Sequence, residues 1–383
     1  MQLNGNARRA TLLYADETPH RTNYHDAARY ARGLYDLGQH LYAFLSPNGS
    51  WQETNTGLIV GDGESLLVDT LLDPPHTHRM LELMRPITDA CPIRYIVNTH
   101  ADGDHWWGNQ LVTKAEIISS EACYEEMQEL SPRAFMSLGT LGSALSLLGR
   151  LPGLARYGRI GDWWQAMLSP YDAYPVKLAL PSHRFTGELT LRVGKREVKL
   201  LEVGPMHTRG DTLVFVPDAK TLYAGDALFV EVTPVLWAGP VERWIAVLDK
   251  ILHMDIDCIV PGHGPLTDKE GVRQMRDYWT FLDGEARRRY MAGMPAQKAA
   301  YDLARSHAFT KSPFAQWDSP ERMLVNIHTL YRWFRGRTTP PKLLERLRIF
   351  AQEADFACAF PNASPARLHR VHPFQPNGPG DSD

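Results

Sequence analysis

The chain has 383 residues, of which 44% are hydrophobic and 22% charged, so it can form one large domain with additions or two modest ones. Its formal net charge of -3 disfavours nucleic acid as a partner, and its four scattered cysteines form no CxxC pair and indicate cytosolic thiols. The N-terminus has no signal-peptide core and no apolar run reaches the ~18 residues of a membrane span, so we expect a cytoplasmic protein without stable membrane insertion.

Residues 1–38 are polar and mixed in pattern, with a possible short helix over 27–37, and we expect them to form an N-terminal segment on the surface. Strand patterns begin at residue 41. Two apolar runs on either side of a Gly61–Glu64 turn predict a hairpin. A helix after Pro75 and a buried strand over 93–97 follow, and then a strand over 115–119 and a helix over 121–130.

Residues 131–181 interrupt this order with a concentration of Leu, Gly, Trp and Pro, which indicates an insertion. It could be a helical hairpin that caps an edge of the core, or a lid that holds apolar side chains over a site. A helix lying on a membrane surface is disfavoured by the few positive charges.

From residue 188 the pattern predicts antiparallel strands, then a helix over 240–254 and a last short strand that ends near residue 264. Two similar halves of strands followed by a helix predict a sandwich, which we place at residues 39–268. We expect a C-terminal helical region over 269–340, through which copies of the chain could associate, and a helical end with a flexible tail over 341–383.

Four potential metal ligands lie within six residues directly after the predicted strand over 93–97. They are His100, Asp102, Asp104 and His105. Alternation along an extended segment turns the first three to one side, and a turn at Gly103 can bring His105 to the same side. The sequence therefore predicts a metal site on this loop, at the edge of a sheet.

Three more candidate ligands, His207, Asp226 and His263, each follow an apolar strand and lie in a glycine-containing loop. Metal sites require nitrogen and oxygen donors that converge from several elements, and small neighbours let the backbone come close. Together with Asp69 and the HxDxDH loop, these residues form an ordered series. That series resembles the motifs of the metallo-β-lactamase superfamily over roughly residues 40–268.

The resemblance implies an α/β fold, specifically an αββα sandwich with two divalent metal ions in a groove between the sheet edges. By this resemblance the first metal takes His100, the residue at position 102 and His207, and the second takes Asp104, His105 and His263. Asp226 corresponds to the carboxylate between the metals. This chain departs from the family in having Asp102 where most members have histidine, and Trp106-Trp107-Gly108 where a glycine pair is usual. Asp102 could also turn away and leave a one-metal enzyme.

The resemblance further implies a hydrolase that uses a metal-bound hydroxide, with Asp104 as the catalytic residue that orients it. We expect zinc, with iron or manganese possible, and Asp69 and Asp211 as partners of the ligand histidines. Trp106 and Trp107 are expected to line a pocket for a small ester, lactone, thioester or amide with an apolar portion. The alternative function is an iron-dependent redox enzyme of the flavodiiron-like branch that lacks its flavin domain.

Overall fold

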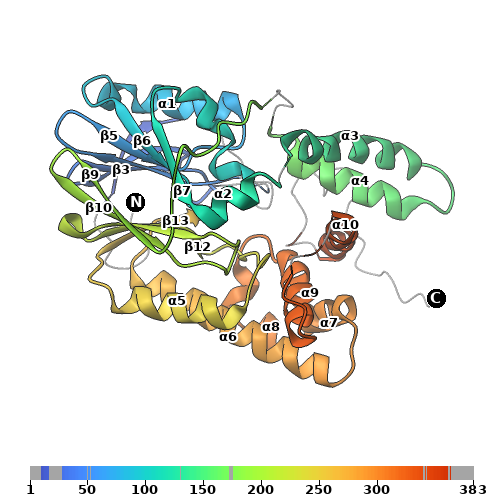
Figure 1. Ribbon diagram of the computed structural model, residues 1–383. Coiled ribbons are helices and arrows are strands. Elements are labelled where there is room, and N and C mark those ends of the chain that lie inside the picture. Colours follow the sequence, from blue (N-terminus) through green and yellow to red (C-terminus); the bar gives the residue numbers. More distant parts are fainter. Residues whose placement is uncertain are drawn as a thin grey trace.

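Figure 1 shows the computed structural model, in which two β-sheets face each other and helices cover their outer sides. The structure describes residues 10–16, 28–49, 51, 53–129, 131–171, 176–339, 341, 343–360 and 363. The predicted αββα sandwich is confirmed. Predictions for the end of the C-terminal tail, beyond residue 363, lie outside the described residues.

The first sheet contains eight strands in the order in which they occur in the chain. The strands are β1 (Thr11–Ala15), β2 (Gly33–Gly38), β3 (Leu41–Leu45), β4 (Thr56–Val60), β5 (Ser65–Val68), β6 (Ile93–Val97), β7 (Glu116–Ser120) and β8 (His183–Phe185). Neighbours are antiparallel from β1 to β5 and parallel from β5 to β8. The predicted hairpin is the β4–β5 pair.

The predicted short helix over 27–37 is wrong throughout its described part, because residues 28–32 are not helical and residues 33–38 form strand β2. This strand pairs with β1 on one side and β3 on the other, and Leu34, Tyr35 and Leu37 are all buried. Pairing on both edges and burial on both faces outweigh the weak local preference for a helix. The first sheet therefore begins before residue 39, within the segment expected to lie on the surface.

The second sheet has five strands in the order β13-β12-β11-β10-β9. They are β9 (Glu188–Val193), β10 (Arg196–Glu202), β11 (Thr212–Val216), β12 (Thr221–Phe229) and β13 (Cys258–His263). The first four are antiparallel to their neighbours and β13 is parallel to β12. Helix α5 (Val241–His253) makes the connection between β12 and β13.

Apolar side chains from both sheets form the core between them, with Leu41 and Val97 from the first sheet and Val198, Val214 and Val260 from the second. The outer face of the first sheet packs against α1 (Pro74–Thr88), and α2 (Glu121–Met127) follows β7. The outer face of the second sheet packs against α5 and α6 (Lys269–Met291). Each sheet is thus buried on both faces, which holds the strand ends rigidly for a site.

The insertion forms a hairpin of two helices, α3 (Pro132–Leu148) and α4 (Ala155–Leu168), as one interpretation of its sequence predicted. The helices approach closely because glycines face each other. A Cβ on Gly161 would lie 2.4 Å from the carbonyl oxygen of Gly142. The C-terminal helix α10 (Leu343–Ala359) packs against α4, so the hairpin is attached to the C-terminal region.

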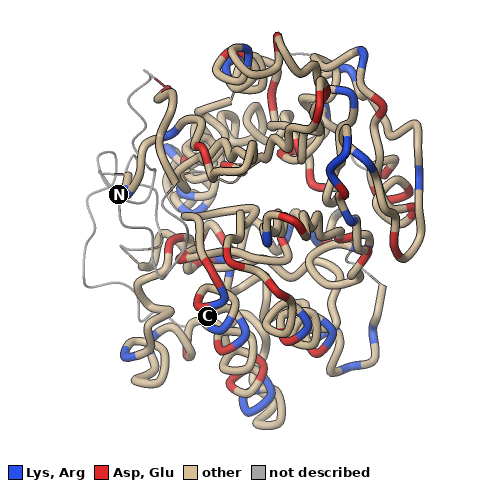
Figure 2. Tube along the Cα trace, turned by 90° about the vertical axis from the view of Figure 1, so that its left-hand side faces the viewer, with Lys and Arg blue, Asp and Glu red and all other residues tan. Residues whose placement is uncertain are grey.

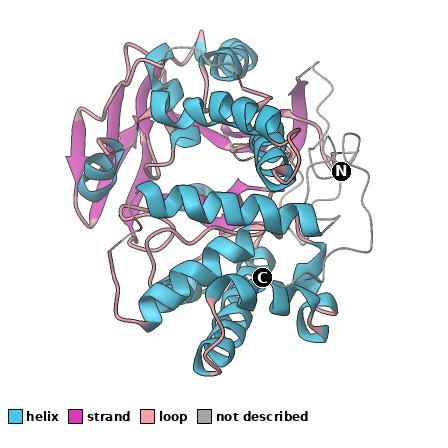
Figure 3. Ribbon diagram, turned by 90° about the vertical axis from the view of Figure 1, so that its right-hand side faces the viewer, coloured by secondary structure: helices cyan, strands magenta, loops and turns pink. Residues whose placement is uncertain are grey.

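The predicted C-terminal helical region contains α6, α7 (Ala296–Arg305), the short α8 (His307–Thr310) and α9 (Arg322–Phe334). Figure 3 shows these helices in front of the strands on the side where the hairpin lies. Acidic and basic residues are interspersed along the chain trace, in agreement with its small net charge (Figure 2). None of the helices within the described ranges is long and apolar enough to cross a bilayer.

Candidate metal centre

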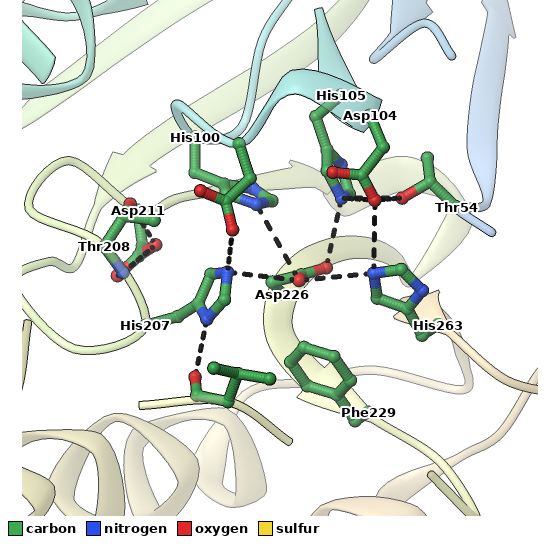
Figure 4. Close-up of polar contacts among 12 residues, drawn as sticks. Thr54, His100, Asp104, His105, His207, Thr208, Asp211, Asp226, Phe229 and His263 are labelled. Carbon is green, nitrogen blue, oxygen red and sulfur yellow. Dashed lines mark hydrogen bonds and ion pairs between the residues drawn. The ribbon is translucent and has the colours of Figure 1, made fainter. Parts of the chain in front are cut away.

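The seven predicted ligands come together at one edge of the sandwich (Figure 4). The loop after β6 supplies four of them, with a short 3-10 turn at Gly103–His105. His207 lies between β10 and β11, Asp226 lies in β12, and His263 ends β13. Gly262 is required beside Asp226, because a Cβ at Gly262 would lie 1.9 Å from Asp226 Oδ1.

The donor atoms divide into two sets, each with two histidines and one carboxylate. In each set they lie within 4.8 Å of one another: His100, Asp102 and His207 in one, and Asp104, His105 and His263 in the other. The structure thus brings together the same residues that the family resemblance assigns to each metal. Both sets supply the nitrogen and oxygen donors that divalent transition metals bind.

Asp226 lies at the centre of the two sets (Figure 4). Its Oδ2 atom lies 3.3 Å from Nε2 of His207, 3.3 Å from Nε2 of His263 and 3.7 Å from Nε2 of His100. Its Oδ1 atom lies 3.3 Å from Nε2 of His105. One carboxylate can therefore contact an ion in either set.

Backbone carbonyls hold two of the histidines at the opposite ring nitrogen. Nδ1 of His207 lies 2.6 Å from the Val235 oxygen, and Nδ1 of His263 lies 2.6 Å from the Glu53 oxygen. A carbonyl can only accept, so each Nδ1 carries the proton and donates it. Nε2 is then the ring nitrogen that faces the centre, and it offers a lone pair there when the imidazole is neutral, which is the arrangement expected for metal ligands.

Asp69 holds a third histidine, as predicted. Its Oδ2 atom lies 2.8 Å from Nδ1 of His105, and both of its oxygens accept hydrogen bonds from Thr99. The Asp69 backbone has a φ of +62°, a conformation that aspartate tolerates better than most residues. Nδ1 of His100 lies 3.0 Å from Thr99 Oγ1, so the same threonine contacts both Asp69 and His100.

Asp211, predicted as a partner of a ligand histidine, acts on His207 through its charge and makes its hydrogen bonds elsewhere in the described structure. Its carboxylate accepts hydrogen bonds from the backbone nitrogens of Met206 and Thr208 and from the Thr208 hydroxyl. Burial raises the pKa of Asp211 to about 7, against the opposing effect of His207 and these hydrogen bonds. Asp211 therefore shapes the backbone of the loop that carries His207, because three donor groups within that loop converge on it.

Asp102 faces the cluster, with Oδ2 3.2 Å from Nε2 of His207. Burial opposes ionisation of Asp102, but the hydrogen bond and charge of His207 outweigh it and lower the pKa of Asp102 to about 2. Burial likewise lowers the pKa of His207, and Asp102 and Asp226 reverse this effect and raise it to about 10. The carboxylate at position 102 is thus held in its ionised form beside the first donor set.

Two buried atoms in the cluster have no hydrogen-bond partner among the residues the structure describes. They are Nε2 of His100 and Oδ1 of Asp226. Buried polar atoms without partners are costly, and a cation between the donors would satisfy both. The residues present therefore fit the divalent ions that the family binds.

Thr54 is a neighbour of the cluster that no sequence motif indicated. It precedes β4, is fully buried, and its Oγ1 atom lies 2.6 Å from Nε2 of His105 and 3.1 Å from Oδ2 of Asp104. A threonine before a strand carries no metal signature. Only the pairing of β4 within the first sheet brings it to the site.

A cavity of about 340 Å³ opens over the cluster and has mainly apolar walls. Trp107 lines it and packs against Phe135 of α3, with ring centroids 5.7 Å apart. Trp106 does not line it as predicted. Its ring is fully buried and its Nε1 donates to the Ala101 carbonyl, so it supports the metal-ligand loop from within. Residues of α3 and α10 complete the walls, so the inserted hairpin also covers the site.

The Metallo-beta-lactamase superfamily model matches residues 49–263, more than half of the chain and the whole of the donor series. The chain belongs to this superfamily. Within the superfamily it is 25% identical over 222 residues to "Linear primary-alkylsulfatase" of Pseudomonas sp. (strain ATCC 19151), a match that covers 55% of this chain and 41% of the relative.

A second relative is "2,4-dinitroanisole O-demethylase subunit alpha" of Nocardioides sp. (strain JS1661), which is 33% identical over 91 residues, 22% of this chain and 26% of its own. The solved structure of a stereoselective inverting sec-alkylsulfatase from Pseudomonas sp. superposes with a TM-score of 0.59 at 16% identity. That match covers 80% of this chain and 50% of the other, and at this identity it shows the fold alone. The chain spans half or less of the length of all three.

Proposed function

We propose that this chain is a metal-dependent hydrolase whose small-molecule substrate has an apolar portion joined through a hydrolysable bond. The bond classes are carboxylic ester, lactone, thioester, amide and sulfate ester. Alkyl sulfates are the first to test, because two of the relatives are alkylsulfatases by name. The names of these relatives also disfavour the alternative function, an iron-dependent redox enzyme.

One observation carries the proposal: the buried donor cluster forms the floor of a cavity with apolar walls. Asp102, Asp104, His207, Asp226 and His263 line the same cavity as the apolar residues. A substrate whose apolar part contacts these walls would have its polar bond directed to the cluster. Binding energy from the apolar part would then hold the bond in place for reaction.

Two divalent ions, zinc by default for these donors, would supply Lewis acidity and a nucleophile at neutral pH. The chain's own residues orient the metal ligands. Asp69 and the Val235 and Glu53 carbonyls fix the histidine rings, and Asp226 faces both donor sets. Asp104, whose Oδ2 lies 3.6 Å from Nε2 of both His105 and His263, is placed to accept a proton from the attacking water.

Metal analysis and a substrate panel test this proposal. Protein purified without exposure to a chelator should contain up to two transition-metal ions per chain. It should release sulfate or alcohol from substrates with apolar chains faster than the Asp226→Asn variant does. Protein replete with metal that cleaves none of the five bond classes above that variant's rate would overturn the proposal.

A further inference from the structure

The cavity has a second polar region that is separate from the metal cluster. Arg322 begins α9 and Glu353 lies in α10, and both line the cavity. They are only 3% and 2% exposed. Within the described residues neither side chain forms a hydrogen bond or ion pair with any of the seven candidate ligands, so the metal cluster does not explain them.

Both side chains are short of partners among the described residues. Arg322 has one hydrogen bond, from Nη1 to the Thr233 carbonyl at 3.3 Å. A guanidinium has five N–H donors, so the other four have no acceptor among the described residues. Glu353 makes no hydrogen bond with the described residues, and no ion pair joins it to Arg322. Buried charged groups are normally paired, because an unpaired one is costly.

Two arginines bring positive charge to this region of the cavity. Burial raises the pKa of Glu353 well above its ordinary range, Glu321 adds to this rise, and Arg322 opposes it. This direction favours the protonated form of Glu353, in which the acid group can donate a hydrogen bond. Arg346 also lines the cavity, with its guanidinium 5.7 Å from the centre of the Trp237 ring, and adds a second positive charge.

The position of this region relates it to the metal centre. Arg322 donates to the Thr233 carbonyl, while His207 donates to the carbonyl of Val235, two residues further along. The Cα atoms of Thr233 and Val235 are at most about 7 Å apart. One ligand can therefore reach from Arg322 to the cluster within this cavity of about 340 Å³.

We propose that Arg322 and Glu353 bind a carboxylate carried by the apolar part of the substrate, away from the bond that is cleaved. The planar guanidinium offers two parallel donors that match the two carboxylate oxygens, and the Glu353 acid group donates to the same anion. This inference rests on the proposed function, since it takes the metal cluster as the place of reaction. It identifies the substrate as an acidic amphiphile.

Two substrates that differ only at the end of the chain test the inference. For the sulfate class they are ω-sulfooxydodecanoate, which ends in a carboxylate, and dodecyl sulfate, which ends in a methyl group. Charged hydrogen bonds of about 1.5–3 kcal/mol predict a kcat/KM ratio of about 10- to 100-fold in favour of the carboxylate. Arg322→Met should reduce the ratio towards one. Arg348→Met, which removes an exposed charge of the same helix as Glu353, should leave it unchanged.

Direct binding separates this inference from the proposed function. Calorimetry on the metal-replete protein should show dodecanedioate binding at least about tenfold tighter than dodecanoate, and Arg322→Met should remove most of that difference. If Arg322→Met does not fold, Arg322→Lys replaces it and should keep the charge but lose part of the preference. Equal binding of the two acids, or an unchanged difference in Arg322→Met, overturns the inference. That holds whether or not any ester is cleaved.

Glu353→Gln tests the assigned donor. An amide also donates a hydrogen bond, so the preference for a carboxylate should stay within about threefold of the wild-type value. A gain of tenfold or more would show that Glu353 is ionised and repels the anion, and its role as a donor would be wrong. If water alone occupies the space beside Arg322, neither the chain end nor the Arg322 variants will change binding.

Discussion

Asn326 connects the C-terminal helices to the metal centre and gives the most direct test of this architecture. It lies in α9 and is fully buried. Its Oδ1 atom accepts from the Leu236 nitrogen at 2.8 Å, and its Nδ2 donates to the Pro234 carbonyl at 2.9 Å. Between these two residues lies Val235, whose carbonyl accepts the proton of His207 Nδ1.

The Asn326→Ala substitution should therefore weaken the first donor set as well as the fold. It removes the two backbone hydrogen bonds and a third, at 3.2 Å, with the Tyr278 hydroxyl. Each is worth about 0.5–1.5 kcal/mol and a stranded buried amide costs about 1–3 kcal/mol, so we expect a loss of about 3–5 kcal/mol in unfolding free energy. Loss of the support behind a ligand histidine typically lowers metal affinity about 10- to 100-fold.

The assay combines urea unfolding with zinc titration against a competing chelator. Leu330→Ala is the matched control: it lies in the same helix, is buried, and should cost about 2–5 kcal/mol while it leaves the hydrogen bonds of Asn326 to Pro234 and Leu236 in place. Only Asn326→Ala should weaken zinc binding at the proposed first metal site. Unchanged zinc binding in Asn326→Ala, or equal weakening in Leu330→Ala, would refute the connection.

Three further predictions concern the site. Asp102→His should raise zinc affinity at the first site and shift the rising limb of the pH–rate profile to lower pH, because a neutral ligand leaves the metal a stronger Lewis acid. Asp102→Ala should empty that site, and a metal titration would show the loss. Asp69→Asn keeps the positive φ but removes the charged acceptor of His105, so zinc affinity at the second site should fall about 10- to 100-fold. The first site should change less, because Asp69 reaches its ligand His100 only through Thr99. Trp107→Ala should change the preference for substrate chain length, whereas Trp106→Ala should cost about 3–5 kcal/mol of unfolding free energy. If Trp106→Ala changed the chain-length preference and Trp107→Ala only lowered stability, the cavity wall described above would be wrong.

The ligand loop could be predicted because its information is local. His100, Asp102, Asp104 and His105 follow one apolar strand within six residues, so their approximate convergence needs only strand geometry and a turn at Gly103. The strands themselves were predictable where apolar runs are bounded by turn residues. The same ordered spacing carried the resemblance that located the distant ligands.

The predictions from sequence were wrong where contacts with other segments determine the local structure. Residues 33–38 became a strand because both β1 and β3 pair with them. Trp106 and Trp107 are adjacent and chemically identical, yet one is in the core of the loop and the other lines the cavity, because a tight turn directs consecutive side chains to different sides. Asp211 supports a loop instead of a histidine ring, since the nearest donors are backbone amides.

The cavity itself was decided only by tertiary structure. The sequence by itself determined which residues could bind metal, because those residues are chemically distinctive and lie at strand ends. Arg322 and Glu353 have no such sequence signature. They line the cavity from helices α9 and α10, which lie far along the chain from the ligand loop. An arginine and a glutamate in helices are ordinarily solvated, and only the packing of α9 against α10 and of α10 against the inserted hairpin buries them where a substrate would lie.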